Sequence, residues 1–555
     1  MRQLTNRKIL FILATIFFLA LGLRIWGIGF GLPYPYHPDE RGHVVEAARM
    51  GAAYGIEPAT FAWPPFYAYV LMFEDAIFVL VMRLSGQLQS FGDIVKQISF
   101  DPSPLYLLGR ATSALFGALT VLVAYALGKE SFNRRTGLIA AWFVAVGFLL
   151  VRESHYAVND ALLTFLSTLS IWGCTLVASK GRMRDYVLAG IAAGFAFATK
   201  YTAAFLVMPL VLGHMVSPDG IKGNLSGSKL KYLLLGGLAF VFSAVAGSPY
   251  FLLKPGKVFQ DVMGSIYTYG QQGFEGWQLD PAGGYLFYLK SLWWGLGIGL
   301  SVLAILGLAS AFLRKPRIAT VLASYPVLLY LFMGEQQMYF ARFILPAIPP
   351  LLVLCAHAVD TIVEKMTLRY FRLNPAFLWF FLFGCAMLVS FQPSIDSLRY
   401  DFLLSQSDTR TIAKEWIEQT IPQGAKIAMD WPHHTPFLST SQRPEPNSLR
   451  TFDVQTIGGH GLSDHDLQYY KSQGFQYLIA SSFIYDIPLT DSEKNSQRKT
   501  FYASLDRELT LMQEFKPYQG DQGPSFIFDE IYGPAVSLWQ RERPGPILKI
   551  YQLAK

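Results

Sequence analysis

Two adjoining stretches decide the fold: ILFILATIFFLALGLRIWGIG (9–29) and YPYHPDERGHVVEAARM (34–50). The first is predominantly apolar, with Arg24 as its single charged residue, and has the length of about 20 residues that crosses a bilayer as a helix. The second places five titratable side chains, from His37 to His43, directly after that span. A membrane-crossing helix followed at once by a dense polar loop is typical of a multi-pass membrane protein whose chemistry lies at the membrane rim.

The composition supports this class. Of the 555 residues, 52% are hydrophobic and only 15% are charged, whereas an average soluble domain carries roughly 25% charged residues. The mean hydropathy is +0.31. These values exclude a disordered chain, a coiled coil and a disulfide scaffold. No clustered basic face is visible, so we expect no nucleic-acid partner.

The distribution of Lys and Arg predicts the topology. Lys and Arg accumulate in cytoplasmic loops, and here six polar segments carry three cations each, namely Arg2, Arg7 and Lys8; Lys129, Arg134 and Arg135; Lys180, Arg182 and Arg184; Lys222, Lys229 and Lys231; Arg314, Lys315 and Arg317; Lys365, Arg369 and Arg372. Placing all six in the cytoplasm fits eleven spans, at 9–29, 105–127, 137–151, 160–178, 186–199, 201–216, 232–251, 285–313, 318–334, 343–360 and 375–392. We therefore expect a plasma (inner) membrane protein with a cytoplasmic N-terminus and an external (periplasmic or extracellular) C-terminus.

One apolar stretch must not cross the membrane if this count holds. Residues 64–84 carry Glu74 and Asp75 at their centre, and a carboxylate at the bilayer midplane costs at least about 2.5 kcal/mol. An amphipathic helix on the outer surface avoids that cost. Residues 31–104 are thus predicted to form one long external loop, with four cations against eight acids. Residues 186–216 are predicted to be two short helices that meet at Lys200.

The chain is predicted to divide into a membrane module, residues 1–392, and an external α/β domain, residues 393–555. The first part holds 30 Lys and Arg against 19 Asp and Glu, and the second holds 16 against 20. In the second part Asp408 is expected to cap a helix to Thr420, and Ser463 one to Gly474. Residues 491–512 are predicted helical, and strands are predicted at 426–430, 475–481, 526–531 and 546–552.

Four external sites carry the candidate chemistry. In the first loop, Asp39 and Glu40 are neighbours that point to different sides, so at most one of them is the central base. The other sites are the turn RESHYAVNDALL (152–163), with His155 and Asp160, then Lys200, and then EQQMYFARFILPAIPP (335–350), with Arg342.

Each site also has a purely structural interpretation. Asp39 and Asp160 are then helix caps, and Glu46 and Arg49 lie on the helix after Asp39. Arg152 pairs with Glu153, Lys200 reaches to the interface, and Arg342 pairs with Glu335.

Their shared side of the membrane favours chemistry over structure. A carboxylate that takes a proton from an acceptor hydroxyl acts as a general base. Fixed cations hold a phosphate and stabilise the charge that develops as it leaves. Transfer of a group from a lipid phosphate needs both of these elements. The combination therefore predicts an enzyme that works on a lipid-linked substrate.

The order of these features resembles the GT-C superfamily of lipid-carrier-dependent glycosyltransferases, in its protein O-mannosyltransferase, aminoarabinose transferase and Rgt-like branch. The likeness rests on HPDE (37–40), FAWPPFYAYV (61–70), RATSALFGALTVLVAYALG (110–128), SHYAVNDALLTF (154–165), AGIAAGFAFATKYTA (189–203) and YFARFILPAIPPLL (339–352). It covers roughly residues 1–360.

The resemblance implies a polyprenyl-phosphate sugar as donor and an inverting displacement. It implies catalytic roles for Asp39 and its neighbour Glu40, and a second acidic site at His155 and Asp160. It implies donor-phosphate contacts from Lys200 and Arg342, and further substrate contacts from His37, Arg41, Trp277 and Tyr339. Some members of the superfamily bind a divalent metal, for which Asp39, Asp160 and His155 are the candidate ligands, although their spacing carries no ligand signature.

Membrane lipids surround the module, and the acceptor, whether glycan, lipid or protein, stays open because no sugar-binding β-trefoil insertion is present. The rival interpretation is a transporter or flippase of lipid-linked sugars. A transporter places charged residues near the midplane and often carries an inverted repeat. No second copy of the HPDE segment exists, which favours the enzyme. A non-catalytic anchor for the C-terminal domain would not need eleven spans.

Overall fold

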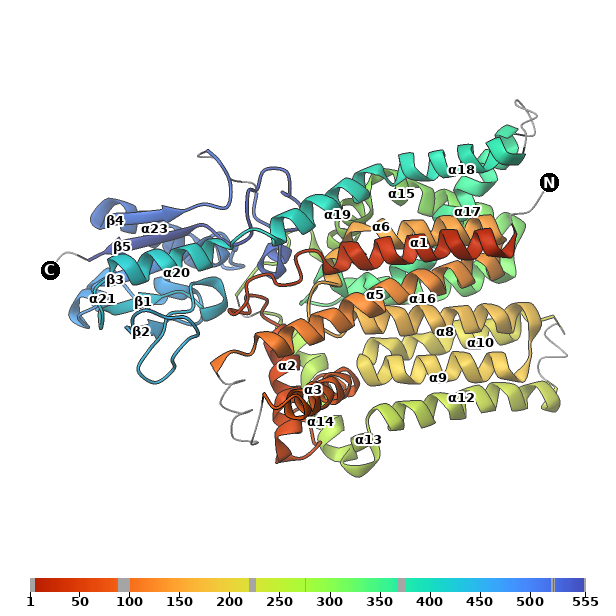
Figure 1. Cartoon of the computed structure of the whole chain (residues 1–555), viewed down its shortest axis with the longest axis horizontal. Helices are drawn as coiled ribbons and strands as arrows, with labels where there is room; N and C mark the ends of the chain where they lie inside the picture. The colour runs from red at the N-terminus through yellow and green to blue at the C-terminus, as the bar shows by residue number, and fades with distance from the viewer. Residues whose placement is uncertain are drawn as a thin grey trace.

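A computed structural model describes residues 5–87, 100–218, 226–274, 276–367, 375–520, 523 and 525–553. A helical bundle occupies one end of the molecule and a smaller sheet-containing part the other, joined by α19 (Phe391–Leu404), as Figure 1 shows. The bundle contains α1 (Asn6–Ile25), α5 (Ser103–Ser131), α6 (Arg134–Val146), α7 (Phe148–Glu153), α8 (Asp160–Lys180), α9 (Met183–Thr199), α10 (Val207–Met215), α12 (Gly227–Gly247), α15 (Gly283–Arg314), α16 (Pro316–Gly334), α17 (Ile348–Met366) and α18 (Pro375–Val389).

The chain is a multi-pass membrane protein. Among the described residues, seven helices are long and apolar enough to cross a membrane, and a bent pair, Leu378–Val389 with Phe391–Thr420, raises the number to eight. The predicted spans at 137–151, 186–199 and 201–216 fall on shorter helices, α6 with α7, α9 and α10. These helices lie alongside α5 and α8 in the bundle (Figure 1). The count of eleven therefore stays a prediction.

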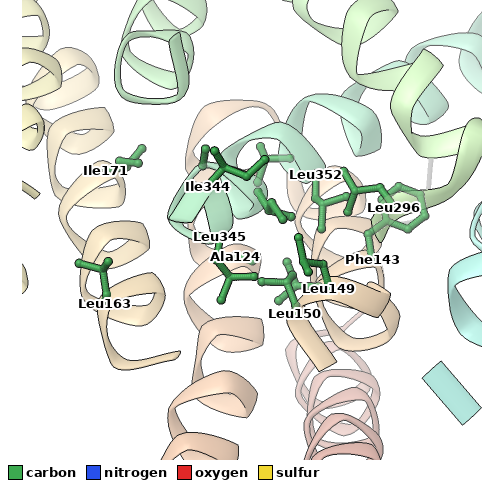
Figure 2. Close-up of a cluster of buried hydrophobic side chains, with 14 of the residues drawn as sticks. Ala124, Phe143, Leu149, Leu150, Leu163, Ile171, Leu296, Ile344, Leu345 and Leu352 are labelled. Carbon is green, nitrogen blue, oxygen red and sulfur yellow. The ribbon is translucent and has the colours of Figure 1, made fainter. Parts of the chain in front are cut away.

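The interior of the bundle is apolar and closely packed. Figure 2 shows a cluster in which α5, α6, α7, α8, α15 and α17 contribute side chains, among them Ala124, Phe143, Leu163, Leu296 and Leu352. Small residues allow the closest helix contacts: a Cβ on Gly190 of α9 would lie 2.1 Å from the carbonyl oxygen of Gly236 on α12. Close backbone approach of this kind is the usual way helices associate in lipid.

A buried cation stabilises the break between α6 and α7. Gly147 has extended backbone there, which leaves carbonyl groups at the end of α6 without helical partners. Arg24 of α1 donates to the carbonyl oxygens of Val144 and Ala145, each at 3.0 Å. The single charge of the first apolar stretch is thus a helix cap inside the bundle.

The first long loop lies across the end of the bundle. It contains α2 (Glu40–Arg49), the π-helical turn η1 (Met50–Tyr54) and α3 (Phe66–Leu84). Beside it lie α13 (Tyr250–Leu253), α14 (Pro255–Tyr267) and the turn η3 (Thr268–Gln272). Figure 1 shows α3 nearly end-on while the bundle helices run across the view. This orientation is the one expected for a helix that does not join the bundle as a span.

The sheet has five strands, in the order β2-β1-β3-β5-β4. Strands β1 (Lys426–Met429), β2 (Asp453–Thr456) and β3 (Tyr477–Ser481) are parallel, while β4 (Thr510–Phe515) and β5 (Leu548–Gln552) run antiparallel to their neighbours. Successive side chains of a strand point to opposite faces of the sheet, so neighbouring strand residues belong to two different apolar clusters. One cluster contains Ile427 and Ile479, and the other contains Ala428 and Leu478. The helices here are α20 (Thr409–Thr420), α21 (Leu467–Ser472), α22 (Ser482–Tyr485) and α23 (Ser492–Glu508).

The local predictions for this part succeeded in some places and failed in others. Asp408 caps α20 through the backbone N–H of Arg410, as predicted. Asp466, not Ser463, caps the helix before Gly474. The helix predicted over 491–512 ends at Glu508, and its last predicted residues, 510–512, begin strand β4 instead. The predicted strand at 526–531 is wrong as well: Phe528–Tyr532 form a 3₁₀ turn, η8, that docks on the bundle.

The two ends of the bundle differ in charge. The N-terminus and the turns between α5 and α6, α8 and α9, and α15 and α16 lie at one end, and the first loop and the sheet lie at the other (Figure 1). The N-terminus and these three turns carry the basic residues, as predicted. The predicted loop cations Arg2, Lys222, Arg369 and Arg372, and part of the predicted external loop, residues 88–99, lie outside the described residues.

Candidate active site

A cavity of about 250 Å³ opens where the first loop meets the bundle. All four external sites singled out in the sequence supply a side chain to its wall: Asp39, Asp160, Lys200 and Arg342. The remaining wall is largely aromatic and apolar, and includes His43, Trp63, Tyr201, Phe205, Ile266, Tyr269, Phe332 and Phe343. A concave, mostly apolar site with a few convergent charges is the usual form of a small-molecule or lipid-headgroup site.

Asp39 is the reachable carboxylate of this cavity. Its side chain is 29% exposed, whereas the side chain of Asp160 is 2% exposed. Arg342 Nη2 donates to Asp39 Oδ2 at 2.7 Å. Asp39 occupies the position before α2 but its side chain makes no capping hydrogen bond, so the interpretation of Asp39 as a helix cap is wrong. The purely structural interpretation, in which Arg342 pairs with Glu335, is wrong as well: Glu335 accepts a hydrogen bond from the Tyr285 hydroxyl.

A break between two helices aims Lys200 at the same cavity. Helix α9 ends at Thr199, and Lys200 has extended backbone (φ −158°, ψ 132°) before the 3₁₀ turn η2 (Tyr201–Leu206), as the sequence predicted. Lys200 Nζ donates to Asp160 Oδ1 at 2.8 Å, and Arg342 Nε lies 3.8 Å from Asp160 Oδ2. Asp160 therefore holds both cations at the cavity wall.

Glu40 does not face the cavity. Its side chain is fully buried and accepts from Arg110 Nε and Nη2, each at 2.7 Å, and from the backbone N–H of Ala157 at 2.8 Å. This corrects the assignment of Glu40 as a catalytic residue. Glu40 fixes the first turn of α2 to α5, and because neighbouring side chains diverge, this contact leaves Asp39 directed to the cavity.

The structure also corrects the assignment of His155 to a second acidic site. It lies inside the bundle, with its Nδ1 2.9 Å from the Val151 carbonyl oxygen and its Nε2 3.0 Å from that of Trp26. The candidate metal ligands Asp39, Asp160 and His155 therefore do not converge. No group of three His, Cys, Asp or Glu side chains suited to a metal ion occurs among the described residues. The charges of Asp39 and Asp160 are instead balanced by Arg342 and Lys200.

The other predicted contact residues lie around the cavity rather than in its wall. His37 is buried against the Tyr156 ring, with centroids 4.2 Å apart, and Arg41 is exposed on α2. The Tyr339 hydroxyl donates to the Asp280 carbonyl oxygen at 2.9 Å. Trp277 packs against Phe528 and Trp431 of the sheet part. Tyr339 and Trp277 thus shape the loop over the site.

The sequence missed the contribution of η8. Tyr532 packs its ring 4.1 Å from the Arg342 guanidinium carbon. Asp529 accepts from the backbone N–H of Ala341 at 3.1 Å, at the start of the 3₁₀ turn η4 (Ala341–Ala347) that carries Arg342. Burial raises the pKa of both Asp529 and Tyr532. The segment FDEIY (528–532) has no distinctive spacing; only its docking reveals a role.

His43 was part of the quoted motif but received no role. It is buried beside Trp63 and Tyr67 in the cavity wall. Burial lowers the pKa of His43 to about 4, so the ring is neutral at physiological pH. A neutral imidazole there adds a hydrogen-bonding group without adding charge.

Comparisons with known proteins agree with this architecture. Residues 107–246 match the family model of dolichyl-phosphate-mannose-protein mannosyltransferase. The chain is 29% identical over 190 residues to dolichyl-phosphooligosaccharide-protein glycotransferase 2 of Pyrococcus furiosus, a match covering 33% of this chain and 24% of that protein. It is 35% identical over 107 residues to the undecaprenyl phosphate-α-4-amino-4-deoxy-L-arabinose arabinosyl transferase of Pseudomonas aeruginosa, covering 18% and 20%. These matches thus span only about a fifth to a quarter of either relative.

The fold is also similar to that of a solved structure, the archaeal oligosaccharyltransferase of Archaeoglobus fulgidus in complex with an inhibitory peptide and a dolichol-phosphate. The TM-score is 0.52 at 14% identity, over 85% of this chain and 69% of that one. Over residues 107–246 the chain is thus similar in sequence to this mannosyltransferase family, and its fold is similar to that of the solved oligosaccharyltransferase.

Proposed function

We propose that this chain is a member of the GT-C superfamily and a membrane glycosyltransferase that moves a sugar from a polyprenyl-phosphate carrier to an acceptor at the external face of the membrane. The observation that carries the proposal is the meeting of one reachable carboxylate, Asp39, with two cations, Lys200 and Arg342, in a single cavity. The relatives' names specify polyprenyl-linked donors, dolichyl-phosphooligosaccharide and undecaprenyl phosphate-aminoarabinose, which supports the donor class.

Asp39 acts as the general base. It takes the proton of an acceptor hydroxyl or amine while the acceptor atom bonds to the anomeric carbon. The bond from that carbon to the phosphate oxygen breaks, and the anomeric configuration inverts. Base catalysis of this kind contributes about 10²–10⁴-fold to the rate.

Lys200 and Arg342 bind the donor phosphate and stabilise the charge that develops on the leaving oxygen. Both cations are largely desolvated, with side chains 17% and 5% exposed, which strengthens their interaction with an incoming anion. Phe332 and Ile266 line the same cavity and are exposed on its outer side, 40% and 53% respectively. They provide an apolar wall for the first units of the lipid chain.

Replacement of Asp39 by Asn tests the base. Membranes that contain the variant are supplied with radiolabelled undecaprenyl-phosphate sugars, and both the release of undecaprenyl phosphate and the label in acceptor fractions are measured. We expect a loss of at least about 100-fold with normal insertion. Glu57→Gln is the matched control, because Glu57 lies on the same loop as Asp39 but away from the cavity, where it accepts a hydrogen bond from Lys254 of another segment. Full turnover in Asp39→Asn, or label that crosses the bilayer without forming a glycosyl product, would contradict the proposal.

We also propose that the first loop and the sheet face away from the cytoplasm. A cysteine at Gln519 should react with a membrane-impermeant maleimide in intact spheroplasts. A cysteine at Arg184, which is 71% exposed at the other end of the bundle, should react only after permeabilisation. The reverse pattern would place Asp39 on the cytoplasmic side, where lipid-linked sugars of this kind are not the expected donors.

A further inference from the structure

The side chain of Arg342 is held by two parts of the chain that are far apart in sequence. On one side Asp39 and Asp160 contact its guanidinium at 2.7 and 3.8 Å. On the other side the guanidinium carbon lies 4.3 Å from the Phe340 ring and 4.1 Å from the Tyr532 ring. Phe340 belongs to the same loop as Arg342, but Tyr532 comes from the C-terminal segment.

The C-terminal segment 528–534 is itself fixed to the bundle by a buried arginine. Arg152 donates to the carbonyl oxygens of Asp529 at 2.7 Å, Gly533 at 3.1 Å and Pro534 at 3.2 Å. Gly533 has φ +124°, and a Cβ there would lie 2.0 Å from the Tyr156 hydroxyl. These contacts fix the backbone on both sides of Tyr532 and so restrict where its ring can lie.

Asp529 reinforces the same arrangement from the backbone side. Its carboxylate accepts from the N–H of Ala341, the first residue of η4, as an N-cap supplied by another segment of the chain. A cap of this kind fixes where a helical turn begins. Arg342 follows one residue later, so Asp529 positions the backbone of Arg342 while Tyr532 positions its side chain.

We propose that Tyr532 is a positioning residue for the donor-phosphate site: its ring holds the Arg342 guanidinium against Asp39, so the C-terminal segment completes a site otherwise built from the membrane module. The inference rests on the proposed function. The attraction between a guanidinium and an aromatic face is strongest when the cation is desolvated, and Arg342 is 4% exposed. Without the Tyr532 ring, the guanidinium keeps the Phe340 ring but loses its nearest aromatic contact, so the arginine side chain is held less firmly toward the cavity.

The test compares Tyr532→Ala and Tyr532→Leu with Tyr532→Phe. The affinity for undecaprenyl phosphate is measured with full-length protein in nanodiscs, and the KM of the undecaprenyl-phosphate sugar donor is measured in the same preparation. We expect the Ala and Leu variants to weaken both about tenfold, equivalent to about 1.4 kcal/mol. The Phe variant keeps the aromatic face and should stay within about twofold of the natural protein. Leu fills most of the volume, so it remains informative if Ala fails to fold.

Ile531→Ala is the matched control. Ile531 belongs to the same turn and is 5% exposed, but packs in the apolar core. It should lower the melting temperature without changing the affinity for undecaprenyl phosphate. Unchanged affinity in Tyr532→Leu, an equal loss in Ile531→Ala, or a loss in Tyr532→Phe as large as in Tyr532→Leu would overturn the inference.

Asp39→Asn, measured in parallel, separates the two proposals. Loss of turnover in Asp39→Asn with unchanged behaviour of Tyr532→Leu would overturn only the role of Tyr532. Full turnover in Asp39→Asn would overturn the proposed function, whatever the Tyr532 variants do.

Discussion

Glu40→Gln should damage the stability of the protein, in contrast to Asp39→Asn beside it. Glu40 is fully buried and its two oxygens accept three hydrogen bonds, two from Arg110 and one from the Ala157 N–H. Gln retains one acceptor but removes the negative charge, which leaves Arg110 buried without a counter-charge. Breaking a buried ion pair by removing one partner costs about 3–5 kcal/mol.

The melting temperature, followed by intrinsic tryptophan fluorescence in detergent, measures this cost. From roughly 2–4 °C per kcal/mol for a domain of about 150–250 residues, we expect a fall of about 5 °C or more for Glu40→Gln. Asp39→Asn should melt close to the natural protein, because Asp39 is partly exposed and Arg342 keeps Asp160 as a neighbour. The double variant Glu40→Gln with Arg110→Met removes both charges and should regain most of the lost stability.

A stable but inactive Glu40→Gln would refute this reasoning. It would mean that Glu40 acts on the substrate and that its pairing with Arg110 is not the reason for its presence. A double variant no more stable than the single one would show that the ion pair is not the source of the loss.

Three further predictions concern the site and its supports. Arg342→Lys should raise the donor KM about tenfold or more, since an ammonium lacks the fork that spans Asp39 and Asp160; equal weakening of donor and acceptor binding would argue against a phosphate role. Arg152→Gln removes contacts to three carbonyl groups and should speed tryptic cleavage after Arg541, which is buried and paired with Glu530 of the same segment; unchanged cleavage would show that these contacts do not hold the segment. Burial lowers the pKa of His434 to about 3, so its stabilising effect is complete above pH 6.5 and is lost as the pH falls toward 3. Between pH 6.5 and 5.5 this amounts to about 1 kcal/mol, and His434→Gln should show a smaller drop in melting temperature; an identical drop would exclude His434 as the source.

The order of the spans and the charges of the loops predict most of the site. Asp39, Asp160, Lys200 and Arg342 come from four different loops, and the structure brings all four to one cavity. The charge pattern of the loops predicts this, because turns that lack the basic residues gather at the end of the bundle opposite the basic turns. The helix break at Lys200 followed from length alone, since residues 186–216 are too long for one span and short for two.

Local patterns failed where a side chain's direction mattered. Glu40 and His155 have the residue types and neighbours of a catalytic site, yet both are held inside the bundle by Arg110 and by backbone carbonyls. Residues 526–531 are predicted to form a strand, but docking against the loop of Arg342 selects a 3₁₀ turn instead. Tertiary contacts outweigh the small differences in local preference that such short segments carry.

The sequence by itself determined the class of protein, the end of the bundle at which the polar loops gather, and the four loops that carry the charged site residues. These follow from the free energy of transferring apolar and charged groups into a bilayer, which depends on composition and order alone. Only the tertiary structure decided that Asp39 rather than Glu40 faces the cavity, and that Tyr532 lies against Arg342. Both depend on which buried charges find partners and on contacts between segments up to hundreds of residues apart, and neither is encoded in any local run of the chain.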